Sequence, residues 1–351
     1  MIVHQLLSGA GPRDAITAEA GAFRDRFAAW GWGGEDFAAR IAPGLEGQFR
    51  SPAQLRVRDD DVLLIHHSAA LPGLDEILLA PGRKLLLHHN VTPARWLWDQ
   101  APVVAAHCAL GREQLSALVR ACDLAAADSA FNAAELSALG VGRTEVLPLL
   151  VDLAPLGAPG EPRVARAQAA HVLFVGRLSP HKRQDRVIEA FALYRDVHAR
   201  GARLTLVGEP LTDAYADSLR ALGDRLAPGA VRVCSGLSPT QLGDVYRSAD
   251  VFLCLSEHEG FCVPLLEAMA LGVPVIARAV GAVPEVAGGA AVIVGEDDPA
   301  LISELLHLVA GDATLRETLI ARGRVRAAAF APAAVAARLR EVVLATVDGG
   351  G

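Results

Sequence analysis

Lysine is almost absent from this chain. Of its 33 basic residues, two are lysine, Lys84 and Lys182, and the others are arginine. Together with the abundance of alanine, this indicates the codon bias of a GC-rich genome, so a lysine kept against that bias is a candidate for a functional role. The 40 acidic residues outnumber the basic ones and give a net charge of −7. This balance excludes a protein whose main role is non-specific nucleic-acid binding, because such binding needs a basic surface.

The chain also lacks the cysteine spacing of a common zinc site. Its five cysteines are widely scattered, and no two of them form a C-x-x-C pair. We therefore expect no metal site and no metal cofactor. The odd number of cysteines and their scatter favour reduced thiols, as in the cytoplasm.

Long apolar runs are missing as well. Residues 1–7 lack a basic region followed by a long apolar stretch, so we expect no signal peptide. Uncharged stretches such as 62–74 are shorter than the roughly 18–20 apolar residues that span a bilayer. We expect a cytoplasmic protein, for which contact with a membrane would be peripheral.

A length of 351 residues, 52% of them hydrophobic, predicts about two domains with a core each. Short apolar runs alternate with helical patterns in both halves, which is typical of parallel sheets covered on both faces. The expected strands are 2–7, 62–66, 84–88, 171–175, 203–207, 231–235, 251–255, 273–277 and 291–294. The expected helices include 15–30, 103–121, 132–139 with Ser129 as its cap, 299–310, 313–321 and 333–345.

A stretch dense in proline and glycine, 147–163, marks a domain boundary. We expect an α/β protein of two Rossmann-like domains, each a doubly wound parallel sheet. The expected parts are an N-terminal domain at 1–150, a linker at 151–170, a second domain at 171–335 and a C-terminal helix at 336–351 that could return to the first domain. Ligands in such folds bind beyond the carboxyl ends of the strands, which here predicts a site in the cleft between the domains.

The strongest local pattern is the segment 256–270, which follows an apolar strand. Pro264 suits the first turn of a helix, whose free amides form an anion site. Glu259 and Glu267 flank that helix start. A carboxylate repels phosphate, so these glutamates fit hydroxyl groups of a sugar better. The alternative is that Glu259 is solvated and Glu267 caps the helix.

A second pattern is 175–182, which again lies between a strand and a helix. Arg177 and Lys182 place two cations beside free helix amides, a combination that suits a diphosphate. The alternative is ordinary surface charge at a turn.

Taken together, these two segments resemble glycosyltransferase family 4, the retaining group with the GT-B fold of two Rossmann-like domains that face a central cleft. The resemblance rests on Gly-Arg-x-x-x-x-Lys at 176–182 and on Glu259-x7-Glu267 within Glu-Gly-Phe…Pro…Glu-Ala-Met-Ala. It extends to 235–251 and 282–285, and it covers about residues 171–345.

The resemblance implies a role for each matching residue. Arg177 and Lys182 would hold the donor diphosphate and stabilise the leaving nucleotide. Glu267 would bind the ribose hydroxyls, and Glu259 would contact the donor sugar. The family commonly has glycine at the position of Cys262. The wider donor-binding set would be Gly176, Gly236, Leu237, Gly260, Phe261, Cys262 and Val263.

The first half resembles the family more loosely. Gly11 and Asp14 lie in a loop similar to the family's glycine-rich loop that faces the donor, which implies donor binding by both. His89 follows a strand where the family places a histidine near the sugar's anomeric carbon, which implies a catalytic role. The alternative for His89 is structural hydrogen bonding at a strand end. On the acceptor side we expect Asn90, Trp96 and Trp98, and core packing is the alternative for the two tryptophans.

An aromatic group at 23–37 allows a peripheral docking face, although its helical spacing favours the core. Its aromatic members are Phe23, Phe27, Trp30, Trp32 and Phe37, with Arg24, Arg26 and Arg40 among them.

The expected activity is retaining, metal-independent transfer of a sugar from a nucleotide-diphosphate donor, GDP-mannose or a UDP-sugar, to a hydroxyl of a glycan, a lipid-linked acceptor or a small molecule. The departing phosphate would take the acceptor's proton. Three alternatives are a non-hydrolysing UDP-sugar epimerase, a non-catalytic nucleotide-sugar binder and a dinucleotide oxidoreductase. The last would use Gly9-Ala10-Gly11, but the third glycine of G-x-G-x-x-G is replaced by Asp14.

Overall fold

The computed structural model describes residues 1–160 and 169–348, which form two compact units. Unit 1 contains Met1–Trp98, Pro102–Asp152 and Phe330–Gly351, and unit 2 contains Asp99–Ala101 and Leu153–Ala329. The boundary expected at 150 therefore falls close to Leu153, where unit 2 takes over. Residues 161–168 of the expected linker and 349–351 of the expected C-terminal helix lie outside the described residues.

Unit 1 is built on a six-stranded parallel sheet in the order β2-β1-β3-β4-β5-β6. Its strands are β1 (Val3–Leu7), β2 (Asp36–Ala38), β3 (Val62–His67), β4 (Arg83–His88), β5 (Leu124–Ala127) and β6 (Thr144–Val146). Its helices are α1 (Ala15–Ala29), α2 (Leu74–Leu79), α3 (Pro102–Ala121), α4 (Ala130–Ala138) and α12 (Pro332–Asp348), with short 3-10 turns η1 (Pro52–Gln54) and η2 (Ala94–Trp96).

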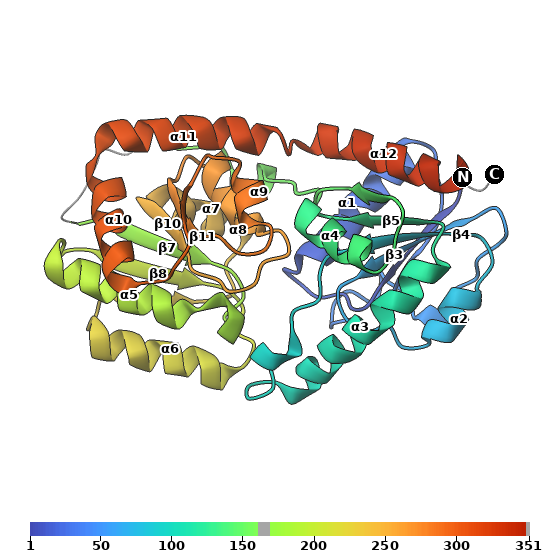
Figure 1. The fold of residues 1–351 in the computed structure, drawn as a ribbon, viewed down its shortest axis with the longest axis horizontal. Helices are drawn as coiled ribbons and strands as arrows, with labels where there is room; N and C mark the ends of the chain where they lie inside the picture. The colour runs from blue at the N-terminus through green and yellow to red at the C-terminus, as the bar shows by residue number, and fades with distance from the viewer. Residues whose placement is uncertain (161–168, 349–351) are drawn as a thin grey trace. The chain divides into compact units, whose positions relative to one another are not determined.

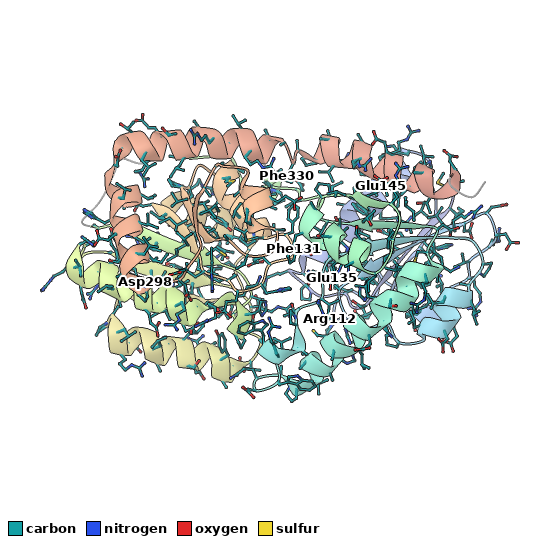
Figure 2. All side chains as sticks on the ribbon, in the orientation of Figure 1. Arg112, Phe131, Glu135, Glu145, Asp298 and Phe330 are labelled. Atoms are coloured by element: carbon teal, nitrogen blue, oxygen red, sulfur yellow. The ribbon has the colours of Figure 1, made fainter. Side chains whose placement is uncertain are left out.

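Successive side chains of a strand point to opposite faces, so this sheet has two apolar cores. On one face, Leu64 and Leu87 pack with α1 and with Leu339 of α12. Figure 1 shows α12, at the red end of the chain, beside the strands of this N-terminal unit. On the other face, α2, α3 and α4 cover the sheet. There Arg112 of α3 forms an ion pair with Glu135 of α4 (Figure 2).

Unit 2 has a second six-stranded parallel sheet, in the order β12-β11-β10-β7-β8-β9. Its strands are β7 (His171–Val175), β8 (Arg203–Val207), β9 (Val231–Cys234), β10 (Val251–Cys254), β11 (Val275–Arg278) and β12 (Val292–Val294). Its helices are α5 (Gln184–Val197), α6 (Asp213–Leu226), α7 (Pro239–Ser248), α8 (Val263–Ala270), α9 (Val283–Ala287), α10 (Pro299–Gly311) and α11 (Ala313–Ala328), with 3-10 turns η3 (Ala154–Leu156) and η4 (Pro180–Lys182). The main core lies between the sheet and α5, α6 and α10. The two sheets confirm the predicted fold class.

Three strands were not predicted. β5 reads Leu-Ala-Ala-Ala, and alanine favours helices over strands. β2 and β6 are three residues each, too short for an alternating pattern to stand out. All three are defined by pairing with neighbouring strands, which the local sequence does not encode. The C-terminal helix begins at Pro332, one residue before the helix expected at 333–345, and it belongs to unit 1 from its first residue rather than from residue 336.

The aromatic group near the N-terminus belongs to the core of unit 1. Phe23, Phe27 and Phe37 are fully buried, while Trp30 and Trp32 pack against Phe27. This outcome confirms core packing as their role. No helix in the described ranges is long and apolar enough to cross a membrane.

The chain also separates its large fluorophores. The tryptophans, Trp30, Trp32, Trp96 and Trp98, all lie in unit 1, and the tyrosines, Tyr194, Tyr215 and Tyr246, all lie in unit 2. Tryptophan emission therefore reports on unit 1 selectively.

Leu339→Ala should destabilise unit 1 by about 2–5 kcal/mol, because it empties a fully buried position between α12 and the sheet. Urea unfolding followed by tryptophan emission measures this change. Leu110→Ala, the same substitution at a position 56% exposed on α3, is the control and should change the stability by less than about 1 kcal/mol. Equal effects of the two substitutions would contradict the placement of α12 in this core.

Candidate functional site

The first expected segment follows β7 and is fixed by a backbone contact with the loop after β8. A Cβ atom on Gly208 would lie 1.8 Å from the carbonyl oxygen of Gly176, so glycine is required for the two loops to touch. Gly176 itself has φ +151°. The following Arg177 is exposed at the surface, and its carbonyl oxygen accepts a hydrogen bond from Gln184 Nε2 at 2.9 Å. Lys182 is the last residue of the turn η4, which follows this segment.

The second expected segment follows β10 and is held by a similar contact. Gly281 has φ +53°, and a Cβ atom there would lie 1.9 Å from the carbonyl oxygen of Glu259. The amide of Ala282 donates to that same oxygen at 3.2 Å. The loop after β11 therefore fixes the backbone at Glu259.

Cys262 precedes α8 in the left-handed region, with φ +75°. Glycine adopts this conformation without cost, whereas a side chain there costs roughly 1–2 kcal/mol. The side chain of Cys262 does not cap α8, so it leaves the helix start to other partners. The family's glycine at this position thus has a physical reason, and this chain meets the same geometry with a strained cysteine.

Lys182 and Glu259 form a direct ion pair, with Nζ 2.7 Å from Oε2. The side chain of Lys182 is 18% exposed and that of Glu259 is 7% exposed. Burial opposes the charge of Lys182, but Glu259 outweighs it and raises the pKa of the lysine above its ordinary value. Glu259 is therefore a paired, buried carboxylate and not a solvated one.

Two cysteine thiols lie beside the Lys182–Glu259 ion pair. The Sγ atoms of Cys254 and Cys262 and one oxygen of Glu259 lie within 4.8 Å of one another, and all three residues are buried. The neighbouring thiol and burial raise the pKa of Cys262 well above its ordinary value. Because Lys182 already neutralises Glu259, this group is satisfied without a metal ion.

Glu267 lies one turn into α8 and is oriented by a residue without an expected role. Tyr246 of α7 donates its hydroxyl to Oε2 of Glu267 at 2.6 Å. Burial raises the pKa of Glu267, and this hydrogen bond opposes the rise. Within the described residues, Oε1 of Glu267 has no hydrogen-bond partner, so it can accept one from a ligand. Tyr246 belongs to a segment that matched the family, yet its partner only becomes visible once α7 and α8 are packed.

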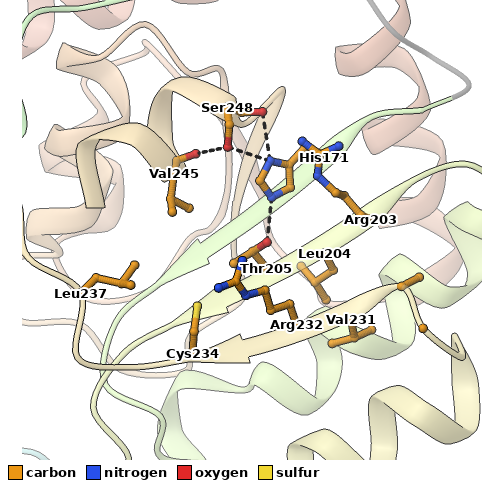
Figure 3. A pocket seen from close by; sticks show the side chains of 12 residues that line it. His171, Arg203, Leu204, Thr205, Val231, Arg232, Cys234, Leu237, Val245 and Ser248 are labelled. Carbon is orange, nitrogen blue, oxygen red and sulfur yellow. Dashed lines mark hydrogen bonds between the residues drawn. The ribbon is translucent and has the colours of Figure 1, made fainter. Parts of the chain in front are cut away.

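Gly236 and Leu237 follow β9, which is separated from β7 by β8 in the sheet. Gly236 has φ +75°, and its amide donates to Oε1 of Glu209 at 3.0 Å. Leu237 lines a hollow of about 330 Å³ between α7 and the strands β8 and β9 (Figure 3). A hydrogen-bonded group of His171, Thr205 and Ser248 forms part of its wall. Of the expected site residues, Leu237 alone lines this hollow, so it is not the expected donor site.

In unit 1, Asp14 caps α1 by accepting the amide of Thr17 at 2.9 Å. The hydroxyl of Thr17 in turn accepts the amide of Gly11 at 3.0 Å. A carboxylate thus occupies the helix start at which a dinucleotide fold binds its pyrophosphate. This geometry disfavours the oxidoreductase alternative.

His89 follows β4, and its ring lies inside unit 1. Its Nε2 is 3.0 Å from Nδ1 of His66, and its Nδ1 is 3.4 Å from Oδ2 of Asp128. The neighbouring Asn90, at φ +70°, donates to Asn132 at 2.6 Å. Both ring nitrogens of His89 therefore face groups of unit 1.

The tryptophans of the expected acceptor side differ in exposure. Trp98 is 48% exposed, whereas Trp96 is half-buried with the guanidinium of Arg95 5.5 Å from its ring centroid. The structure thus brings Lys182, Glu259 and Cys262 together in unit 2.

Residues 163–326 match the family model described as Glycosyl transferases group 1. The match covers the sheet of unit 2 and both expected motifs. Unit 2 is therefore the part of the chain that is similar to this family.

Two curated relatives have the same kind of name. The chain is 33% identical over 223 residues to D-inositol 3-phosphate glycosyltransferase of Kineococcus radiotolerans, an alignment that covers 56% of this chain and 50% of that protein. It is 32% identical over 252 residues to D-inositol 3-phosphate glycosyltransferase 1 of Catenulispora acidiphila, with 67% and 60% covered. The chain thus spans about half the length of the curated relatives it matches.

Solved structures extend the likeness to both units. The sucrose-phosphate synthase of Thermosynechococcus elongatus superimposes with a TM-score of 0.76 at 19% identity, over 99% of this chain and 100% of that one. HepE of Anabaena, in a complex with UDP and glucose, gives 0.72 at 16% identity, over 98% and 99%. At this identity the likeness establishes the fold, which is the two-domain Rossmann-like fold of GT-B glycosyltransferases.

Glu267→Gln should make unit 2 more stable at neutral pH and less sensitive to pH. Because the folded pKa of Glu267 is raised, the folded state holds its proton more tightly than the unfolded chain does. The unfolding free energy of the wild type therefore falls as the pH rises from about 4.5 through the folded pKa. Glutamine has no such proton to lose.

Circular dichroism during urea unfolding at pH 5 and pH 8 tests this, with tryptophan emission identifying the transition of unit 1. The gain from Glu267→Gln should be larger at pH 8. A gain that is absent, or larger at pH 5, contradicts the burial of this carboxylate.

Proposed function

We propose that the chain is a glycosyltransferase that moves a hexose from a nucleoside-diphosphate donor to an acceptor hydroxyl. The observation that carries this proposal is the buried Lys182–Glu259 pair at the carboxyl ends of β7 and β10, with Glu267 in the helix that follows, in the part of the chain that matches the group 1 family model. Ligands of such sheets bind at this edge.

Lys182 supplies a permanent positive charge for the departing diphosphate. Its pKa is raised, so it stays protonated at neutral pH. Arg177 adds a second, exposed cation on the same loop, and the start of α8 adds oriented amides. Preorganised charges of this kind stabilise a leaving group where negative charge develops. In this proposal the transfer needs no metal ion, because side chains and amides neutralise the diphosphate.

Binding of the nucleotide-sugar donor must change the partner of Lys182. Glu259 holds the ammonium in the absence of ligand, at 2.7 Å. When a diphosphate shares that ammonium, the carboxylate of Glu259 can accept a hydroxyl of the donor sugar. Glu267 accepts the ribose hydroxyls through Oε1, while Tyr246 keeps the carboxyl group oriented. Both glutamates thus accept hydrogen bonds from neutral hydroxyl groups and do not contact phosphate. The donor-side set further includes Gly176, Gly236, Leu237, Gly260, Phe261, Cys262 and Val263.

The stereochemistry and the acceptor follow from the resemblance. The proposed transfer is retaining: the acceptor hydroxyl attacks the face that the nucleotide leaves and gives its proton to the departing phosphate. The relatives named for D-inositol 3-phosphate favour a polyol hydroxyl as the acceptor, and the neighbour solved with UDP favours a uridine donor over GDP-mannose. Contact of His89 with the donor would require its ring to leave His66 and Asp128.

Lys182→Met should lower kcat about 10²–10³-fold, because it removes a charge that stabilises the leaving group. Glu267→Ala should lower kcat/KM about 10–100-fold through weaker donor binding. Both rates come from a coupled assay of nucleotide release with a polyol acceptor. Arg200→Met, which removes an exposed cation of the same unit, is the control and should stay near the wild-type rate. Near wild-type turnover of both site variants would refute the donor-site assignment.

A thermal-shift panel tests the donor class directly. It compares UDP, GDP, ADP, dTDP and their common sugar conjugates with NAD(H) and NADP(H). A ligand present at 100 times its dissociation constant adds about 2.7 kcal/mol of stability, and the uridine series should give the largest rise. A rise with the dinucleotides alone would overturn the proposal in favour of an oxidoreductase.

A further inference from the structure

Unit 1 contains a second group of buried ionisable side chains, outside the donor site. Glu19 of α1, His66 at the end of β3 and His89 just after β4 converge on one point and are all buried. They lie on the face of the sheet that α1 and α12 cover. Oε2 of Glu19 is 3.8 Å from Nδ1 of His66 and 3.5 Å from Nε2 of His89, and the two nitrogens are 3.0 Å apart.

The hydrogen bonds around His66 fix which of its nitrogens carries the proton. The amide nitrogen of Gln5 donates to the carbonyl oxygen of Ala20 at 2.9 Å and to Asp36 at 2.8 Å. Its oxygen, Oε1, therefore faces Nε2 of His66 as an acceptor, at 3.0 Å. Nε2 of His66 must donate, so Nδ1 points its lone pair at the centre of the group.

The same reasoning applies to His89. Its Nδ1 faces a carboxylate oxygen of Asp128 and donates to it, which leaves the lone pair of Nε2 directed at the centre. Burial lowers the pKa of His89 to about 3, so the ring is neutral. Two lone pairs thus face each other with no hydrogen between them.

Glu19 adds a third acceptor. Its Oε1 accepts the amide of Leu150 at 3.1 Å, but its buried Oε2 has no hydrogen-bond partner among the described residues. Burial, with contributions from the nearby Asp128 and Asp14, raises the pKa of Glu19 well above its ordinary value, and the hydrogen bond from Leu150 opposes that rise only in part. A buried acceptor without a donor costs about 1–3 kcal/mol, and a cation at this point would satisfy both imidazole lone pairs and the carboxylate of Glu19 at once.

We propose that Glu19, His66 and His89 bind one divalent transition-metal ion, of the zinc type, inside unit 1. The point equidistant from the three atoms is about 2.0 Å from each, and an ion raised to tetrahedral angles would have bonds of about 2.1 Å, which are zinc bond lengths. The second ring nitrogens already donate to Gln5 and Asp128, as those of metal-bound histidines do. Two imidazoles favour zinc-like ions over Mg²⁺ or Ca²⁺, which prefer oxygen.

The charges also balance. The carboxylates of Glu19 and Asp128 together neutralise a dication, so the buried ion would leave no net charge in the core. The ion would join α1, β3 and β4, and it would hold unit 1 without taking part in the transfer. It would also hold His89 away from the donor, so the metal role and the sugar-contact role exclude each other for this residue.

The neighbouring histidines provide a matched control. His67 and His88 lie on the opposite face of the same two strands, with their Nδ1 atoms 3.1 Å apart. Nε2 of His67 donates to the carbonyl oxygen of Gly111 at 3.0 Å, and Nε2 of His88 faces Glu135 at 3.1 Å. This pair has no carboxylate between the two Nδ1 atoms and is not among the groups whose ligand atoms converge.

The test is zinc retention by the full chain. Protein stripped with a chelator is incubated with Zn²⁺, desalted and analysed by elemental mass spectrometry. The wild type and the controls His67→Gln and Cys254→Ser should each keep one zinc, and Glu19→Gln should keep less than a tenth of that. Cys254→Ser excludes the thiol group of unit 2 as the binding site. Co²⁺ should give the weak visible bands of nitrogen and oxygen ligands, without the intense thiolate band.

A second measurement, the melting temperature with and without Zn²⁺, distinguishes loss of the metal site from misfolding. Zn²⁺ should raise the tryptophan-detected melting temperature of the wild type and of His67→Gln, and it should leave Glu19→Gln unchanged. Without metal, Glu19→Gln should melt higher than the wild type, because its amide can donate to an imidazole. The proposal is overturned if Glu19→Gln and the wild type retain equal amounts of zinc, or if neither retains any. Glu19, His66 and His89 would then form a hydrogen-bonded group without a metal ion. Neither readout depends on transfer, so failure here is distinct from failure of the proposed function.

Discussion

A buried carboxylate must find a partner, and the partners of three glutamates organise the functional parts of this protein. Glu259 has the ammonium of Lys182, Glu267 has the hydroxyl of Tyr246, and Glu19 has one backbone amide. The first is neutralised, the second is half satisfied, and the third faces two more acceptors. What each glutamate still lacks underlies the ligand proposed for it. For Glu259 this is a diphosphate that shares Lys182, for Glu267 it is neutral hydroxyl groups, and for Glu19 it is a cation.

The need for a partner also explains why the backbone is so tightly specified around the proposed donor site. An ion pair at 2.7 Å tolerates little displacement, and the two loops that carry it are each fixed by a glycine contact. Gly208 permits the approach to Gly176, and Gly281 permits the approach to Glu259. Neither contact involves the ligand. Both fix the backbone near Lys182 and Glu259, so the geometry of this ion pair depends on glycines outside the two motifs.

Much of the fold was predictable, because each sheet is built mainly from short apolar runs such as 62–66 and 251–255. These strands are buried on both faces, and their sequence records that burial directly. The short strands β2, β5 and β6 were missed because pairing defines them. For the proposed donor site, motif spacing singled out Lys182, Glu259 and Glu267 as candidates, but the contacts that each of them makes depend on packing. Tyr246 and Gly281 gain their roles only from neighbours in space.

The metal proposal shows a different limit of sequence reasoning. Glu19, His66 and His89 are far apart in the chain, so they form no spacing pattern of the C-x-x-C kind. Of the three residues, the sequence suggests a role for His89 alone, and it does so through the residues next to it. The parallel register brings the ends of β3 and β4 side by side, and α1 supplies the carboxylate from above the sheet. Convergent lone pairs are a property of the hydrogen-bond network, which no linear pattern records.

The separation of tyrosine and tryptophan has a consequence for studying motion. Tyrosine emission overlaps tryptophan absorption, so excitation energy passes from Tyr194, Tyr215 and Tyr246 to the four tryptophans with an efficiency that depends steeply on distance. Every such donor lies in one unit and every acceptor in the other. The efficiency of this transfer therefore depends on the spacing of the two units, and it can be measured in the natural protein without any attached dye.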